Sequence, residues 1–472
     1  MRHSLFASLQ RGFPEDLNAP ALVEPTASSI SYGDLLRRSG GIAAALQSQG
    51  LRQGDRLLVQ TGKSVEGLLL YLAAIRSGIV YVPLNPGYTA AEIDYFVRDA
   101  EPALFVDEAR LAALASAPAA EFADPELAAE SLAAILYTSG TTGRSKGAML
   151  SQRNLASNAE TLIGEWKFTG SDRLIHALPI FHVHGLFVAT HCVLGSGASM
   201  LWLPGFDADA ILAAMPDATV LMGVPTFYTR LLARPDLTPE RTSSMRLFVS
   251  GSAPLSAETH RAWEGRTGHR ILERYGMTET GMLASNPYEG ARRAGSVGPP
   301  LPGVDIRIAS ADADGVGAIE VRGPNVTSGY WRNFEKTAES FTPDGFFRTG
   351  DLGRFDNDGY LWIVGRAKDL IISGGFNVYP AEVEDAIEAL PGVAEVAVVG
   401  VPHPDFGEGV IAVIVPRPDQ VVTKERVSAA LRETLAAYKR PKRILIRDAL
   451  PRNAMGKVEK AVLRKELAGL FA

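Results

Sequence analysis

A stretch rich in glycine and hydroxyl side chains, residues 137–147 (Tyr-Thr-Ser-Gly-Thr-Thr-Gly-Arg-Ser-Lys-Gly), is the part of the chain best suited to bind an anion. Its glycines let backbone N–H groups turn toward phosphate oxygens, and Lys146 adds a mobile positive charge. It is not a Walker A loop, because Gly147 rather than Ser or Thr follows the lysine. A polar surface loop has a similar composition, so the other motifs must decide between the two. The predicted phosphate-binding residues are Thr138, Ser139, Gly140, Thr141, Thr142 and Lys146.

A second motif places a carboxylate among hydroxyl groups, since residues 274–280 read Arg-Tyr-Gly-Met-Thr-Glu-Thr. Mg²⁺ beside nucleotide phosphates takes one or two carboxylates as ligands, so Glu279 is a candidate metal ligand. The alternative is the start of a helix with Thr278 as its N-cap.

Other segments carry charges in patterns that suit a nucleotide site. Asp351 follows a glycine turn, where its carboxylate can accept two ribose hydroxyls at once. Arg366 and Lys368 lie together in residues 365–369, for which a charged loop between domains is the alternative. Lys457 ends the segment 451–457, and a lone lysine near a C-terminus is commonly only a solvated charge.

The elements that must position these residues change in character along the chain. Up to about residue 300, strand-length apolar runs alternate with helix-patterned segments, which predicts α/β layers with largely parallel strands. Beyond Gly298, short alternating strands between Gly- and Pro-rich turns predict a small antiparallel β subdomain, and roughly the last hundred residues predict a separate α+β domain. The expected helices are 32–49, 65–77, 380–389 and 424–437, and the expected strands are 56–60, 78–83, 218–223, 245–250, 305–308, 318–321, 360–364, 394–399, 410–415 and 443–446.

The bulk composition excludes several classes of protein. The 472 residues suggest two or three domains, and the net charge of -6 does not favour nucleic acid or an anionic membrane as a partner. A single cysteine, Cys192, excludes an internal disulfide and fits a reducing compartment. The weakly charged segment 185–203 suits buried strands and loops better than a membrane-spanning helix. We therefore expect a cytoplasmic protein without membrane partners.

Taken together and in this order from residue 137 to residue 457, the motifs resemble those of the acyl-adenylate-forming enzyme superfamily, which includes acyl-CoA synthetases, luciferases and adenylation domains. The resemblance implies a large N-terminal domain, residues 1–367, and a mobile C-terminal lid, residues 368–472, with a hinge at Lys368. It also implies two half-reactions. A carboxylate first attacks the α-phosphorus of ATP to give acyl-AMP and pyrophosphate, and the thiolate of CoA then displaces AMP after the lid rotates.

The same resemblance implies roles for individual residues. Lys457 is implied to stabilise the adenylation transition state, and its acetylation would inactivate the enzyme because the charge is lost. Glu279 is implied to bind Mg²⁺ and Thr280 to touch the α-phosphate. The further residues implied to bind ATP or AMP are Gly251, Ser252, Ala253, Glu273, Tyr275, Gly276, Asp351 and Arg366, and those implied for the hinge and the CoA tunnel are Lys368, Ser373, Gly374 and Gly375.

Within the superfamily, the segments 175–182, 222–230, 250–254 and 273–280 resemble those of malonyl-CoA synthetases. By that resemblance Arg230 and Ser252 hold the distal carboxylate of malonate, and methylmalonate is a further expected substrate. An arginine in an apolar pocket segment is costly unless it is paired, although Arg230 could equally bridge to a structural carboxylate. His182 stands where amino-acid-activating relatives commonly have Asp, which argues against an amino acid. The residues implied to bind substrate are Val183, His184, Arg230, Ser252, Gly276, Met277 and Met282.

Several alternatives stay open at this point. The chain could be another short-chain acyl-CoA synthetase, or a stand-alone adenylation enzyme that loads a carrier protein. A non-catalytic nucleotide-binding regulator is disfavoured because Lys146, Glu279, Asp351 and Lys457 are all present. Four histidines between His176 and His191 raise the question of zinc, but no Cys or carboxylate stands at ligand spacing among them.

Overall fold

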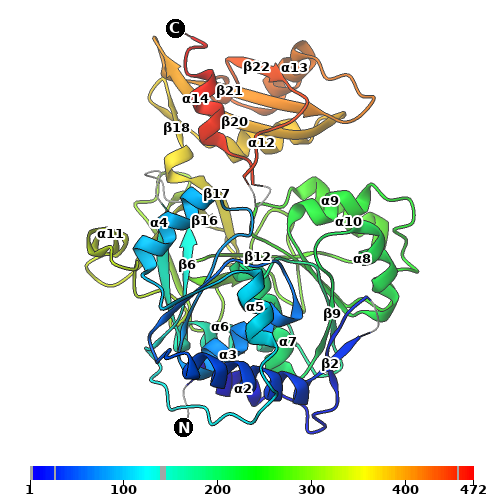
Figure 1. The fold of residues 1–472 in the computed structure, drawn as a ribbon. Coiled ribbons are helices and arrows are strands. Elements are labelled where there is room, and N and C mark those ends of the chain that lie inside the picture. The colour runs from blue at the N-terminus through cyan, green and yellow to red at the C-terminus, as the bar shows by residue number, and fades with distance from the viewer. Residues whose placement is uncertain (1–3, 26–27, 139–144, 454–456, 472) are drawn as a thin grey trace.

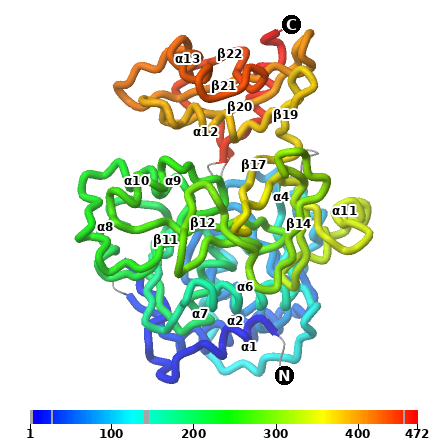
Figure 2. Tube along the Cα trace, turned by 180° about the vertical axis from the view of Figure 1, so that it is seen from behind, coloured from blue at the N-terminus to red at the C-terminus, as the bar shows by residue number. Residues whose placement is uncertain are grey.

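The computed structural model describes residues 4–25, 28–138, 145–453 and 457–471. Two lobes are evident, a large N-terminal domain and a smaller C-terminal domain that sits above it as a lid (Figure 1). The view from behind shows the same arrangement, with the two chain ends at opposite poles (Figure 2). This architecture confirms the fold class expected from the sequence.

Two mostly parallel sheets form the body of the large domain. Each sheet ends in an antiparallel pair, β6 with β7 in the smaller sheet and β12 with β13 in the larger one. From edge to edge, the smaller sheet contains β5 (Leu104–Val106), β3 (Arg56–Val59), β4 (Val80–Pro83), β6 (Leu132–Thr138) and β7 (Lys146–Ser151). The larger sheet contains β13 (Gly281–Ser285), β12 (Leu272–Met277), β11 (Leu247–Ser250), β10 (Val220–Gly223), β8 (Arg173–His176), β9 (Ser199–Trp202), β1 (Pro20–Val23) and β2 (Ser29–Ser31).

Helices pack on these sheets and share one large hydrophobic core with them. Local sequence sets their ends. Ser31 and Asp34 form a capping box at the start of α2, and Ser64 caps α3, which ends at Gly78 in the left-handed conformation with φ 73°. The helices of this domain are α1 (Leu5–Gln10), α2 (Tyr32–Ser48), α3 (Val65–Ser77), α4 (Ala90–Ala100), α5 (Glu108–Ala115), α6 (Gln152–Glu165), α7 (Thr190–Ser196), α8 (Ala208–Ala214), α9 (Pro225–Leu232), α10 (Ala257–Thr267) and α11 (Phe334–Ser340).

One expectation about this domain was wrong. The weakly charged segment that begins at residue 185 does not start with strands, because His184–Ala189 form a π-helix that continues into α7 and only then reaches β9. The segment is buried, and Cys192 lies in the core as expected. None of the helices in the described ranges is long and apolar enough to cross a membrane.

A four-stranded antiparallel sheet completes the large domain, in agreement with the expected antiparallel subdomain. Its strands are β14 (Asp305–Ala309), β15 (Gly317–Arg322), β16 (Phe347–Phe355) and β17 (Leu361–Arg366). A single turn of 3₁₀-helix, Ala367–Asp369, then leads into the lid.

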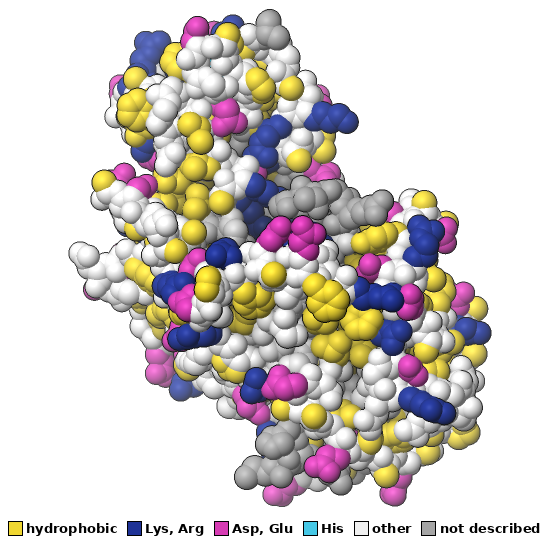
Figure 3. Space-filling view, turned by 90° about the vertical axis from the view of Figure 1, so that its left-hand side faces the viewer, with side chains coloured by type: hydrophobic (Ala, Val, Ile, Leu, Met, Phe, Trp, Pro, Cys, Tyr) yellow, Lys and Arg dark blue, Asp and Glu magenta, His cyan; other side chains and the backbone are white. Residues whose placement is uncertain are grey.

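The lid has its own hydrophobic cores, one on each face of its sheet. The sheet contains β19 (Phe376–Val378), β18 (Ile371–Ser373), β21 (Gly407–Pro416), β20 (Val393–His403) and β22 (Arg443–Ile446), and the helices are α12 (Pro380–Glu388), α13 (Lys424–Thr434) and α14 (Lys460–Leu467). The expected lid elements are all present, but the short hairpin of β18 and β19 was not foreseen. Figure 3 shows the lid as a separate lobe, with Lys and Arg side chains near the junction.

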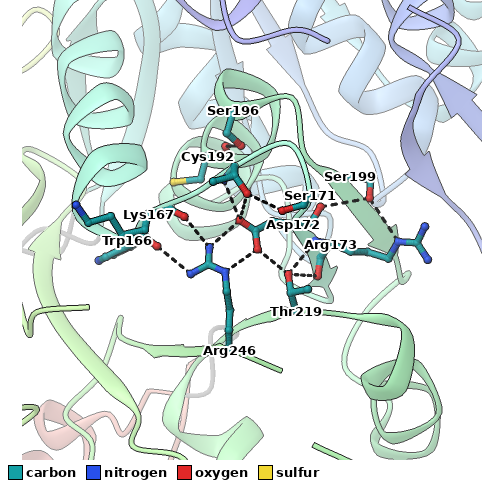
Figure 4. Close-up of polar contacts among 11 residues, drawn as sticks. Trp166, Lys167, Ser171, Asp172, Arg173, Cys192, Ser196, Ser199, Thr219 and Arg246 are labelled. Carbon is teal, nitrogen blue, oxygen red and sulfur yellow. Dashed lines mark hydrogen bonds and ion pairs between the residues drawn. The ribbon is translucent and has the colours of Figure 1, made fainter. Parts of the chain in front are cut away.

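The starting ends of the parallel strands are tied together by a buried ion pair (Figure 4). Asp172, just before β8, is 2% exposed, and its two carboxylate oxygens lie 2.6 and 2.7 Å from Nε and Nη2 of Arg246, just before β11. Thr219, just before β10, donates to the same carboxylate at 2.8 Å. Burial would raise the pKa of Asp172, but the hydrogen bonds from Arg246, the Thr169 amide and Thr219 outweigh it and hold that pKa below its ordinary value.

Candidate active site

The site residues predicted from the sequence lie at the other end of the large sheet, beyond the carboxyl ends of its parallel strands. His182 and His184 follow β8, and Gly251 and Ser252 follow β11. Ligands of open α/β sheets bind beyond the carboxyl ends of the strands, because the loops there converge. The predicted residues of these loops are therefore in the place where a site is expected.

Glu279 is held in a hairpin turn rather than at a helix start. Residues 278–280 connect β12 to β13, so the helix alternative was wrong. The carboxylate is 5% exposed and accepts from the Tyr330 hydroxyl at 3.0 Å and from the Thr138 hydroxyl at 3.3 Å. Burial raises the pKa of Glu279. In the described part of the chain it has donors but forms no ion pair, so a divalent cation would supply the missing charge.

The phosphate loop is only partly described. Thr138 ends β6 and Lys146 begins β7, and the two residues are paired across the sheet. The predicted positions Ser139, Gly140, Thr141 and Thr142 lie outside the described residues. Lys146 lies close enough to Glu279 for the two charges to interact, although burial and Lys336 lower its pKa.

Asp351 is a buried residue of β16, and both of its carboxylate oxygens have partners. Oδ2 accepts from the Tyr275 hydroxyl at 2.5 Å, and Oδ1 lies 2.9 Å from Nε of Arg366. Burial raises the pKa of Asp351, while the charge of Arg366 opposes that rise. The structure thus brings together three of the residues predicted to bind nucleotide, and a ribose here would share or replace these partners.

Three other residues predicted to bind nucleotide lie in the hairpin of β12 and β13. Thr280 is completely buried, and its hydroxyl donates to the carbonyl of Gly281 at 3.0 Å. At Gly276 a β-carbon would lie 2.1 Å from that same carbonyl, so the hairpin requires glycine. Glu273 is buried with a pKa raised to about 8 by burial, and its Oε1 accepts from the Leu255 amide at 3.3 Å.

Lys457 reaches this region from the lid. It is solvent-exposed, yet desolvation and then the cations Arg366 and Arg274 lower its pKa, while Asp351 and Glu279 raise it. Lys457 therefore lies within interaction distance of charged groups of the large domain, although its own side chain is exposed. The lid is also held to the large domain by the ion pair of Arg417 with Glu258 at 2.8 Å.

The predicted acyl pocket contains a strained serine and a buried histidine. Ser252 has a left-handed backbone with φ 70°, which is costly for a residue other than glycine, and its Oγ lies 3.3 Å from Nδ1 of His184. His184 is 2% exposed, and its Nε2 has no hydrogen-bond partner among the described residues. Val183 and Met282 are buried, and Ala253 and Met277 are half-buried.

Arg274 is the site residue that sequence reasoning missed. It is 3% exposed and lies in β12, and neither Nε nor Nη2 finds a hydrogen-bond partner within the described residues. A β-carbon on Gly251 would lie 2.3 Å from its guanidinium carbon, so Gly251 makes room for it. Its charge lowers the pKa of His184, after burial, and burial lowers its own pKa to about 10. The sequence feature that could have pointed to Arg274 is its position within β12, where a charged side chain is unusual.

Arg230, by contrast, does not lie buried in an apolar pocket. It is exposed in the last turn of α9, with its guanidinium 5.4 Å from the ring centroid of Phe206. The expectation that this cation is buried was wrong, because the residue is exposed, whereas its assignment to the distal carboxylate stays a prediction. Among the described residues, no group of three or more His, Cys, Asp or Glu side chains is placed so that it could hold a metal ion.

The predicted hinge and CoA residues stay within the lid and its connection. Lys368 lies in the connecting 3₁₀ turn. Gly374 and Gly375 form the tight turn between β18 and β19, with φ of 60° and 80°, and the Gly374 amide donates to the Phe406 carbonyl at 2.8 Å. Ser373, at the end of β18, is buried. The turn that contains Lys368 directly follows the strand that ends at Arg366, whereas Ser373, Gly374 and Gly375 belong to the hairpin of the lid.

Comparison with known proteins agrees with this geometry. Residues 10–331 match the model of the AMP-binding enzyme family, and residues 382–457 match that of the AMP-binding enzyme C-terminal domain. The chain therefore belongs to the AMP-binding enzyme family.

Individual relatives are similar over most of the chain. Malonate–CoA ligase of Arabidopsis thaliana is 37% identical, covering 89% of this chain and 79% of its own. Feruloyl-CoA synthase of Amycolatopsis sp is 35% identical, covering 93% and 94%. Among solved structures, ATP-bound MatB from Rhodopseudomonas palustris is 51% identical over the whole of both chains, with a TM-score of 0.97, whereas apo MatB gives 0.86. The chain as a whole is thus more similar to the ATP-bound structure than to the apo structure.

Proposed function

We propose that this chain is an ATP-dependent malonate–CoA ligase, which forms malonyl-AMP and then malonyl-CoA. Malonate–CoA ligases and the full-length match to MatB at 51% identity support malonate as the acid, although a feruloyl-CoA synthase is also 35% identical to the chain. The observation that carries the proposal is the buried guanidinium of Arg274, whose Nε and Nη2 have no hydrogen-bond partner among the described residues, near His184, which in turn contacts Ser252.

The electrostatics favour an acid with a second carboxylate. A buried cation without a partner is costly, and a substrate anion removes that cost. An aromatic monocarboxylate would leave Arg274 unpaired after its only carboxylate had been placed for reaction near Lys457. Malonate carries one carboxylate for each of these cations. We therefore assign Arg274, with Ser252 and His184, to the distal carboxylate, and Val183 and Met282 to the space around C2.

In the first half-reaction, the other carboxylate attacks the α-phosphorus of ATP and pyrophosphate leaves. Lys457 stabilises the negative charge that develops on the phosphoryl oxygens, as a positioned cation does in a partly desolvated site. Asp351 and Tyr275 hold the nucleoside, and Thr280 lies beside the α-phosphate. Glu279 would hold Mg²⁺, which when bound neutralises phosphate charge.

In the second half-reaction, CoA displaces AMP. We propose that residues 368–472 rotate about Lys368, so that Ser373, Gly374 and Gly375 line the path of the CoA thiol. The separate hydrophobic cores of the lid support its movement as one body. Acetylation of Lys457 would remove its charge and stop the first half-reaction. The lone buried Cys192 is compatible with a reducing compartment, and we propose the cytoplasm.

A pyrophosphate-release screen tests this proposal. Acetate, malonate, methylmalonate, succinate and benzoate are each supplied with ATP and Mg²⁺, with and without CoA. Malonate should give the highest kcat/KM, methylmalonate should also react, and free CoA should suffice as acceptor with formation of the thioester. Faster turnover of benzoate or acetate than of malonate would contradict the assignment of Arg274. Release of pyrophosphate without thioester formation would point to a carrier protein as acceptor.

A further inference from the structure

Lys63 lies behind the acyl pocket in a setting that the proposed mechanism does not use. Its Nζ lies 2.9 Å from Nδ1 of His176 and 2.6 Å from the carbonyl oxygen of the same residue. The amine also lies 4.3 Å from the ring centroid of Trp202. Burial lowers the pKa of Lys63 well below its ordinary value, and burial and then Lys63 lower that of His176. A lysine in such a position is held for a reason other than surface charge.

The contacts of His176 fix which ring nitrogen carries the proton. A carbonyl oxygen can only accept, so Nε2 of His176 carries the hydrogen and donates to the carbonyl of Gly185 at 3.0 Å. Nδ1 is then left to accept from Nζ of Lys63 at 2.9 Å. Lys63 therefore favours the same tautomer that the Gly185 carbonyl requires.

At Gly185 the backbone packs closely against the preceding loop, next to His184. The Gly185 carbonyl also accepts from the backbone N–H of Thr190, five residues later, and from the Thr190 hydroxyl at 2.9 Å. A β-carbon at Gly185 would lie 2.0 Å from the carbonyl oxygen of Pro179, so the fold-back is tight. π-helices are rare and occur mostly as single turns, frequently at functional sites. This one begins at His184, whose ring faces Ser252.

We infer that Lys63 is a positioning residue for substrate, which acts through His176 and the Gly185 carbonyl to hold His184 against Ser252. The inference rests on the proposed function in one respect, that His184 and Ser252 contact the acid. The contacts run from the loop after β3 through the end of β8 to the π-helix. There the peptide bond joins Gly185 to His184, whose ring contacts Ser252. Lys63 itself does not touch substrate.

A double-mutant cycle tests this chain of contacts. Lys63→Met keeps the length of the side chain and removes the donor, and it should raise the KM for malonate about tenfold, with little change in kcat or in the KM for ATP. In the His184→Ala background the same change should have no further effect, because the residue through which Lys63 acts is gone. Equal effects in both backgrounds would overturn the inference.

Tyr71→Phe is the matched control. It removes a 2.7 Å bond to another buried ring, Nε2 of His191, in α7 directly after the π-helix. It should lower Tm and leave the KM for malonate unchanged, and an equal rise in that KM would show that general loosening of the segment explains the Lys63 effect. Lys63→Leu, which also lacks a donor, replaces Lys63→Met if the latter does not fold. If the wild type does not turn over malonate, the cycle is run with the acid that it turns over best, so that failure of the proposed substrate leaves this test intact.

Discussion

The two ends of the large parallel sheet differ in how they pair an arginine that is at least partly buried. At the starting ends of the strands, Arg246 makes a two-point ion pair with Asp172, and further bonds to backbone carbonyls satisfy the rest of its guanidinium group. At the carboxyl ends, Arg274 is more deeply buried, and its Nε and Nη2 lack partners within the described residues. A satisfied network fixes the fold, whereas an unsatisfied group in the same sheet costs stability unless a ligand completes it. This difference in hydrogen bonding distinguishes a structural region of the sheet from a binding region.

The largest expected effect is on the structural end. Arg246→Met leaves the Asp172 carboxylate buried without its cation, and should lower the free energy of unfolding by ~3 to 5 kcal/mol. Urea unfolding measures the loss. The kcat/KM for malonate per folded molecule should stay unchanged, and a comparable loss of that value would end the distinction between the two ends of the sheet.

The second largest effect is expected at Lys457, the cation that the lid contributes. Lys457→Ala should slow malonyl-AMP formation by ~3 to 4 kcal/mol in activation free energy, as for loss of one preorganised stabilising group. Thioester formation from supplied malonyl-AMP should largely survive, because the cation acts in the first half-reaction. The two steps are measured separately, by pyrophosphate exchange and by malonyl-CoA release, and equal losses in both would show that the assigned role is wrong.

Arg274→Met sharpens the comparison directly. Loss of a buried partner for the distal carboxylate should cost malonate turnover about 3 kcal/mol in kcat/KM. Unlike the change at Arg246, it should leave the free energy of unfolding unchanged or raise it, because a buried unpaired charge gives way to an apolar side chain of similar volume. The measurements are kcat/KM for malonate and for acetate, together with a urea curve. A stability loss like that of Arg246→Met would mean that Arg274 is paired in solution.

The pH dependence should show the lowered pKa of Lys457. Lys457 acts as a cation, so kcat/KM for adenylation should fall as pH rises through that lowered pKa, below the range of an ordinary lysine. Lys457→Arg remains charged at higher pH, and should shift the alkaline limb upward even if its rate is lower. An alkaline limb at the same pH in both proteins would assign the titration to another group.

The smallest effect is expected at Arg230. Because its side chain is exposed and contacts only the ring of Phe206 among the interactions described, Arg230→Ala should change kcat/KM for malonate by less than ~1 kcal/mol. The same assay on acetate serves as the control. A loss for malonate as large as that of Arg274→Met, with acetate spared, would restore Arg230 as the partner of the distal carboxylate.

Much of this molecule was determined by sequence alone, where the signal is local. The span of α3 and of β22 follows from apolar periodicity and end signals, and the fold class follows from the order of such elements. Tyr275, Asp351 and Arg366 belong to short motifs that resemble those of a known superfamily, and that resemblance predicted that they would meet. The roles proposed for them remain predictions.

Tertiary structure alone decided which charged groups are buried and which are paired. Arg230 follows an apolar run and Arg274 begins a known motif, yet Arg230 is exposed, whereas Arg274 is buried and its Nε and Nη2 lack partners among the described residues. Burial depends on what packs against a residue from distant parts of the chain, here Gly251 against Arg274, and no local pattern records it. The π-helix at His184 has the same origin, because its turn is held by His176 and Lys63, which lie 9 and 113 residues from the atoms they contact.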